Sequence, residues 1–104
     1  MSDAYMPMLA REAAAPFDSP EWLLEIKWDG IRALCTIGRS GEVSLRSRNG
    51  RELLGIFPEI GEIAGLAPES SVLDGEIVAM RRGKPDFQAL MQRAQKTDPQ
   101  QIAY

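Results

Sequence analysis

Short runs in which apolar and polar residues alternate, each closed by a turn dipeptide, constrain the fold of this chain most. Such runs cover residues 22–28, 31–38 and 42–48, and Asp-Gly, Ser-Gly and Asn-Gly dipeptides follow them in turn. A period of two is typical of half-buried strands, and these dipeptides favour tight turns. The sequence therefore predicts an antiparallel meander of three strands, with Trp22 and Trp28 in the core.

The rest of the chain predicts two helices and further strands. Spacing close to that of a helix predicts one over residues 56–66, and residues rich in Val, Leu and Ile predict a strand over 71–80. An aspartate cap predicts a second helix over 86–95, followed by a polar connection at 97–101 and a new strand from residue 102. The apolar side of the second helix is expected to comprise Phe87, Leu90, Met91 and Ala94. These elements predict an α+β fold, an antiparallel sheet with flanking helices, over residues 21–104 after an irregular arm at 1–20.

The composition is that of an ordinary globular protein. The chain has 104 residues, of which 44% are hydrophobic and 26% charged, enough for one small domain or a piece of a larger one. No apolar run approaches the roughly 18 residues that a membrane span needs, and the first ten residues lack the pattern of a secretory signal. We therefore expect neither a disordered tail nor a membrane protein.

The chain has one cysteine and no histidine. These counts exclude an internal disulfide, a Cys/His zinc site and histidine-based catalysis within the 104 residues. Cys35 alternates with core positions, so we expect it to be a small packed side chain in a protein of the reducing cytoplasm. No metal-ligand set is predicted.

The charges are arranged in blocks. The formal net charge is −3. Basic residues nevertheless outnumber acidic ones in residues 32–51 and 81–96, whereas residues 52–76 contain acidic residues and no basic ones. Blocks of this kind can form a basic face that contacts a phosphate backbone, or they can be solvated surfaces. The charge pattern alone leaves both readings open.

The string Glu25–Arg32 carries the most chemical information. A lysine amine in a pocket acts as a nucleophile once it has lost its proton. Desolvation and Arg32 would favour the neutral amine of Lys27, whereas Glu25 and Asp29 would favour the ammonium form. Taken alone, the lysine fits a sheet edge beside an Asp-Gly turn equally well.

Residues 27–32, KWDGIR, match the K-x-D-G-x-R signature of covalent nucleotidyltransferases. Further family motifs are matched in order by PMLA at 7–10, SRNG at 47–50, LDGEIV at 73–78 and DFQALMQR at 86–93. The chain thus resembles the ATP-dependent DNA ligases of bacteria, in particular the end-joining ligase module. The resemblance implies the N-terminal part of an adenylation domain with a partial ATP-grasp-like nucleotidyltransferase fold.

The resemblance also implies roles for individual residues. Lys27 would be the catalytic nucleophile that takes AMP from ATP and passes it to the 5′-phosphate of nicked or broken double-stranded DNA. Glu25 would border the adenine, and Arg32 and Arg48 would hold AMP and the 5′-phosphate. Glu76 would bind the ribose or help to place Mg²⁺ or Mn²⁺. Arginine suits phosphate because its planar fork grips two oxygens at once.

Other readings remain open beside this one. Two later family motifs and the OB-fold domain lie outside these 104 residues, so we expect the isolated chain to be inactive or only partly active in sealing. No adenine-stacking aromatic is assigned, and Tyr104 is not given that role. The alternatives are an RNA ligase or capping-type nucleotidyltransferase, a non-catalytic DNA-binding or interaction module, and a half that assembles with a separate second half.

Overall fold

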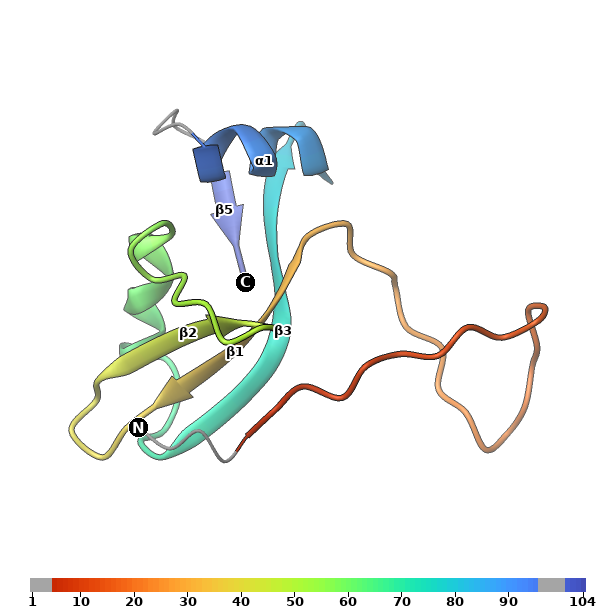
Figure 1. The fold of residues 1–104 in the computed structure, drawn as a ribbon, viewed down its shortest axis with the longest axis horizontal. Coiled ribbons are helices and arrows are strands. Elements are labelled where there is room, and N and C mark those ends of the chain that lie inside the picture. Colours follow the sequence, from red (N-terminus) through yellow and green to blue (C-terminus); the bar gives the residue numbers. More distant parts are fainter. Residues whose placement is uncertain (1–4, 96–100) are drawn as a thin grey trace.

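A computed structural model describes residues 5–95 and 101–104 of the chain. The polar connection predicted at 97–101 and the first four residues of the predicted arm fall almost wholly outside that part. The regular elements in chain order are β1 (Ile31–Ile37), β2 (Val43–Ser47), the 3-10 helix η1 (Pro58–Gly65), β3 (Ser71–Arg81), β4 (Lys84–Pro85), α1 (Phe87–Gln95) and β5 (Gln101–Ala103) (Figure 1).

The strands form one antiparallel sheet in the order β2-β1-β3-β4, and β5 also pairs with β3. The predicted hairpin of β1 and β2 is confirmed, and so are the predicted strand at β3 and the new strand near the end of the described chain. β3 is long enough to pair with β1 over its first half and with β4 and β5 over its second half. The α+β class expected from the sequence is confirmed.

The core lies on one face of the sheet. Ala33, Cys35 and Ile37 alternate along β1 and are almost wholly buried, as the period of two predicts. The two helices cover this face, and one apolar cluster joins them to the sheet. Its fully buried members include Leu45, Leu53, Phe57, Ile60, Ile77, Ala79, Ala89 and Leu90. The opposite face of the sheet is left for polar side chains.

The strand predicted at residues 22–28 is not formed. Residues 5–29 have no helix or strand. Their first few residues lie against the sheet, and the rest project from it as a long loop before the chain enters β1 (Figure 1). Trp22 is 64% exposed and Trp28 is 44% exposed, so the expectation that both lie in the core is wrong. Both edges of β1 are taken, by β2 and β3, so residues 22–28 cannot pair with the strand that follows them, as the predicted meander requires.

Both predicted helices form, with two corrections. The first is a 3-10 helix over Pro58–Gly65 with proline in its first turn, rather than an α-helix over 56–66. The second, α1, buries Ala89 and Leu90, whereas Phe87 is 46% exposed and does not belong to the buried side. Phe87 is the first residue of α1, where the helix has not yet reached the core.

Asp86 caps α1 as predicted. The backbone N–H of Ala89 donates to Asp86 Oδ1 at 3.0 Å. Replacing Asp86 by alanine is expected to lower the free energy of unfolding by about 1 kcal/mol, because the N–H group loses its partner. Urea denaturation monitored by circular dichroism measures this free energy. Asp86 also pairs with Arg81 at 3.8 Å, so Arg81→Ala is the control: an equal loss there would assign the effect to the ion pair and not to the cap.

Candidate functional site

The face of the sheet opposite the core carries a row of polar side chains from β1 and β3. Arg32 lies directly across from Glu76, and the next position on this face pairs Leu34 with Asp74. Side chains two residues apart on a strand point to the same face, so Asp74 and Glu76 both stand beside Arg32. Residues more than 40 positions apart in sequence therefore meet through the pairing of β1 with β3.

Asp74 holds the guanidinium of Arg32 through two hydrogen bonds. Arg32 Nε donates to Asp74 Oδ1 at 3.0 Å, and Nη2 donates to Oδ2 at 2.6 Å. Arg32 Nη1 donates to the backbone carbonyl of Met8, which brings the N-terminal arm over this face. Two parallel bonds of this kind fix the plane of the guanidinium as well as its position. The arginine is thus already oriented without a ligand.

The three groups affect one another's protonation. The hydrogen bonds from Arg32 hold the pKa of Asp74 below its ordinary value, although partial burial opposes them. Burial raises the pKa of Glu76, and Asp74 adds to the rise while Arg32 and Lys27 oppose it.

Lys27 lies in the exposed loop that leads into β1. Its side chain is 92% exposed, and Nζ is 3.7 Å from Asp29 Oδ1. The expectation of a lysine on a strand is wrong, because residues 22–28 form no strand. Gly30 fixes the end of the loop: a Cβ there would lie 2.1 Å from the carbonyl oxygen of Ile77. Only glycine allows this close approach, which brings the loop against β3 beside Glu76.

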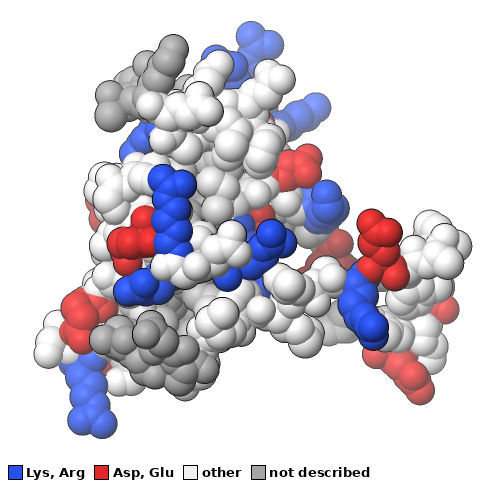
Figure 2. Space-filling model, in the orientation of Figure 1, with Lys and Arg blue, Asp and Glu red and all other residues white. Residues whose placement is uncertain are grey.

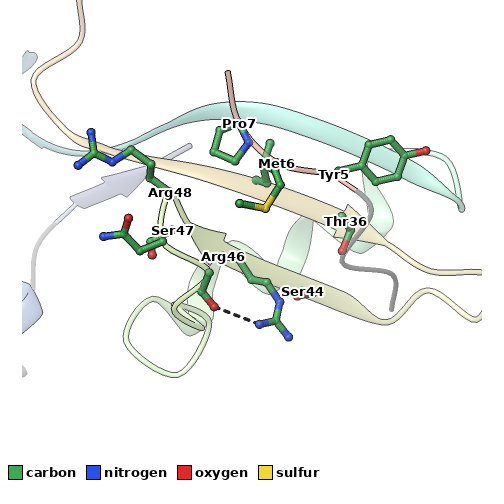
Figure 3. A pocket seen from close by; sticks show the side chains of 11 residues that line it. Tyr5, Met6, Pro7, Thr36, Ser44, Arg46, Ser47 and Arg48 are labelled. Carbon is green, nitrogen blue, oxygen red and sulfur yellow. Dashed lines mark hydrogen bonds between the residues drawn. The ribbon is translucent and has the colours of Figure 1, made fainter. Parts of the chain in front are cut away.

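Arg48 stands at the end of β2. The pairing of β1 with β2 ends at Ala33 and Ser47, and Arg48 is the first residue of the turn that follows. A pocket of about 230 Å³ lies beside it, between the hairpin and the arm. Its lining comprises Tyr5, Met6, Pro7, Leu34, Thr36, Ser44, Arg46, Ser47, Arg48, Asn49 and Gly50. Figure 3 shows the guanidinium groups of Arg46 and Arg48 pointing in opposite directions, and Arg46 donates to the carbonyl of Gly50 at 3.1 Å.

The structure thus brings Lys27, Arg32 and Glu76 into one region, with Arg48 at its edge. Glu25 lies in the exposed loop, where no cavity encloses it in the described part of the chain. Sequence reasoning gave no role to Asp74, although its position two residues before Glu76 puts it on the same face. Apart from the PMLA motif, nothing in the sequence indicated the hydrogen bond between Arg32 and the carbonyl of Met8.

The surface charges and carboxylates of the site bear on possible ligands. Figure 2 shows acidic and basic side chains interspersed over one face of the molecule, not gathered in a single basic patch. Over residues 5–95 and 101–104, no three His, Cys, Asp or Glu side chains form a cluster that could hold a metal. Mg²⁺ is commonly held by one or two carboxylates and the phosphates of a substrate, and Glu76 fits that use.

No helix in the described part is long and apolar enough to cross a membrane.

The shifted carboxyl groups predict how stability responds to acid. Because Asp74 has a lowered pKa in the folded chain, its contribution is present above its unfolded pKa and is lost as the pH falls through the folded value. Glu76 has a raised pKa, so its contribution has the opposite sign: it is present at low pH and is lost as the pH rises through the folded value.

As the pH falls below about 4, the ordinary pKa of an aspartate, Asp74→Asn is therefore expected to lose less stability than the parent chain. Glu76→Gln is expected to lack the stability that Glu76 adds to the parent chain as the pH falls toward about 4.3, the ordinary pKa of a glutamate. Urea midpoints measured from neutral pH down through both values test both variants. An unchanged acid dependence in Asp74→Asn would contradict the role given to the Arg32–Asp74 pair.

Comparison with known proteins identifies similar sequences and folds. The sequence model of a family described as "ATP dependent DNA ligase domain" matches residues 7–103. The chain is 40% identical over 96 residues to the multifunctional non-homologous end joining protein LigD of Mycolicibacterium smegmatis, covering 89% of this chain and 12% of that protein. It is 42% identical over 94 residues to DNA ligase C1 of the same organism, covering 84% of this chain and 26% of that protein.

A solved structure agrees with these matches. A mycobacterial DNA ligase D complexed with ATP and MES superposes with a TM-score of 0.63 at 35% sequence identity, covering 75% of this chain and 25% of that chain. This chain spans between about an eighth and a quarter of the length of these three proteins.

Proposed function

The chain belongs to the ATP-dependent DNA ligase domain family, and from that premise we propose that it is the N-terminal part of an adenylation domain whose parent protein seals DNA. We propose residues 1–20 as an irregular arm and residues 21–104 as the domain portion. The observation that carries the proposal is the pairing of Arg32 with Glu76 across β1 and β3, with the loop of Lys27 held against β3 at Gly30. The names of the relatives favour DNA over the RNA and capping alternatives.

In the proposed reaction, Lys27 Nζ gives up a proton and attacks the α-phosphorus of ATP. An Nζ–P bond forms, the bond from that phosphorus to the bridging oxygen breaks, and pyrophosphate leaves. The AMP then passes to the 5′-phosphate of the DNA, and the 3′-hydroxyl of the neighbouring strand displaces it. Lys27 carries AMP between the first two steps and is regenerated.

The remaining residues position the charged groups. Arg32, oriented by Asp74, presents a fixed cation to a phosphate, and Arg48, in the turn after β2, would add a second cation. Glu76 is placed to accept hydrogen bonds from the ribose, and Glu25 is proposed to border the adenine. Phosphoryl transfer depends chiefly on positioning and charge neutralisation, which such a set of residues can supply.

We also propose Mg²⁺ or Mn²⁺ as the metal, with Glu76 as the carboxylate of this chain that would help to hold it. The metal would neutralise charge on the triphosphate as pyrophosphate leaves. A cytoplasmic location is proposed because the single thiol, Cys35, is free and buried, which fits a reducing compartment.

A chimaera tests the function. The segment of DNA ligase C1 that aligns with this chain is replaced by the chain's own residues, and the purified protein is incubated with ATP and Mg²⁺. We expect its intact mass to rise by one AMP and peptide mapping to place the adduct on Lys27. A folded chimaera without the adduct, or with the adduct on another lysine, would contradict the proposal. Binding of nicked DNA without the adduct would favour the non-catalytic DNA-binding module.

A further inference from the structure

Tyr104 packs against the sheet directly behind the polar row. It follows β5, which pairs with β3 at Val78–Met80, and its ring reaches back along β3 to Gly75. A Cβ at Gly75 would lie 3.1 and 3.3 Å from two atoms of this ring and 3.4 Å from the hydroxyl oxygen. A glycine inside a strand usually weakens it, and here the missing side chain is what gives the ring its place. Gly75 lies between Asp74 and Glu76, so the ring supports the strand where both carboxylates project.

The hydroxyl of Tyr104 bridges the two strands that carry the site. It lies 2.8 Å from the carbonyl oxygen of Ala33 on β1 and 2.9 Å from that of Leu73 on β3, and its single proton is shared between these two acceptors. The carbonyl of Leu73 belongs to the peptide group that joins it to Asp74, and the carbonyl of Ala33 lies one residue beyond Arg32, so the hydroxyl lies beside the backbone that carries the Arg32–Asp74 pair. A carbonyl oxygen has two lone pairs and can accept this bond in addition to one in the sheet ladder.

We propose that Tyr104 is a positioning residue that clamps β1 to β3 and thereby fixes Arg32 and Asp74 for phosphate binding. The link to phosphate binding rests on the function proposed above. The ring fills the space over Gly75, and the hydroxyl sets how β1 lies against β3 at this point. Burial raises the pKa of Tyr104, so the hydroxyl keeps its proton and remains a donor. Tyr104 thus acts from the core face on a site that it does not touch.

Hydrogen exchange of the Arg32 Nε–H, followed by NMR on the 104-residue chain without ATP, tests the clamp. This proton is protected by Asp74 Oδ1 in the parent chain. Tyr104→Phe keeps the ring on Gly75 and removes only the hydroxyl. We expect the exchange rate of Arg32 Nε–H to rise about fivefold, the factor that corresponds to the loss of one ordinary hydrogen bond. The backbone amide of Leu90 in α1 is expected to keep its rate.

Ile60→Val is the matched control. Ile60 is a core residue of η1 with 7% exposure, and removing one methyl group costs a similar amount of global stability. If Arg32 exchange rises equally in both variants, or in neither, Tyr104 contributes only to general stability and the clamp is wrong. The two tests are independent of each other. A chimaera that forms no AMP adduct would contradict the proposed function but not the clamp. Unchanged exchange of Arg32 Nε–H in Tyr104→Phe would contradict the clamp but not the proposed function.

Discussion

Lys27→Ala is expected to abolish the AMP adduct in the chimaera with DNA ligase C1. In the proposed reaction this amine is the atom that bonds to the α-phosphorus, so without it the first step has no acceptor. The structure gives the side chain room to react, since it is 92% exposed and lies in the loop that Gly30 holds against β3. The intact mass after incubation with ATP and Mg²⁺ is expected to equal that of the untreated protein.

Two further variants make the result specific. Lys27→Arg keeps a positive charge but carries a guanidinium that stays protonated in proteins, so it is also expected to form no adduct. Lys84→Ala removes an exposed lysine from β4, away from the polar row, and is expected to leave the adduct unchanged. A normal adduct in Lys27→Ala would mean that another residue is the nucleophile, and the assignment would have to be withdrawn.

The alternation of apolar and polar residues predicted which face of a strand is buried better than it predicted whether a partner strand is present. Alternation correctly gave β1 and its buried face, because each buried position recurs every second residue. The same alternation over residues 22–28 gave a strand that does not form. Alternation states which face a strand would bury, but it does not state which other strand is present to pair with it.

The spacing of Ile60 and Ile63 shows a second limit. A separation of three residues places both side chains on one side of a 3-10 helix or of an α-helix, so the pattern could not distinguish them. Gly61 and Gly65 weaken the preference for the α form, and η1 is a 3-10 helix. The apolar spacing therefore indicated a helix without indicating which kind.

The arrangement of the site depends on the pairing of β1 with β3, which no short stretch of sequence predicts. Arg32 and Glu76 were named from motifs, yet their adjacency follows from the register of β1 against β3. The two hydrogen bonds from Arg32 to Asp74 follow from the same register. Tyr104 could not be assigned from sequence, because its role depends on Gly75 leaving space behind the strand.

Phe57→Ala is expected to cost the chain a large share of its stability. Phe57 is fully buried just before η1 and belongs to the cluster that joins the helices to the sheet. Removing a buried phenylalanine side chain typically costs about 3 to 5 kcal/mol, through lost burial and the cavity that remains. A domain of this size is commonly stable by only about 5 to 15 kcal/mol. The urea midpoint is therefore expected to fall sharply, and near 37 °C part of the population should be unfolded.

The ring of Phe57 also supports a polar contact at the edge of the core. The guanidinium of Arg93 lies 5.7 Å from the ring centroid and pairs with Glu59 at 2.8 Å, which ties α1 to η1. Phe17→Ala is the control, since Phe17 is 48% exposed and contacts Trp22 edge-on in the long loop. That variant is expected to stay within about 0.5 kcal/mol of the parent chain. Equal losses in the two variants would mean that the loop, and not the sheet with its two helices, is a main source of stability.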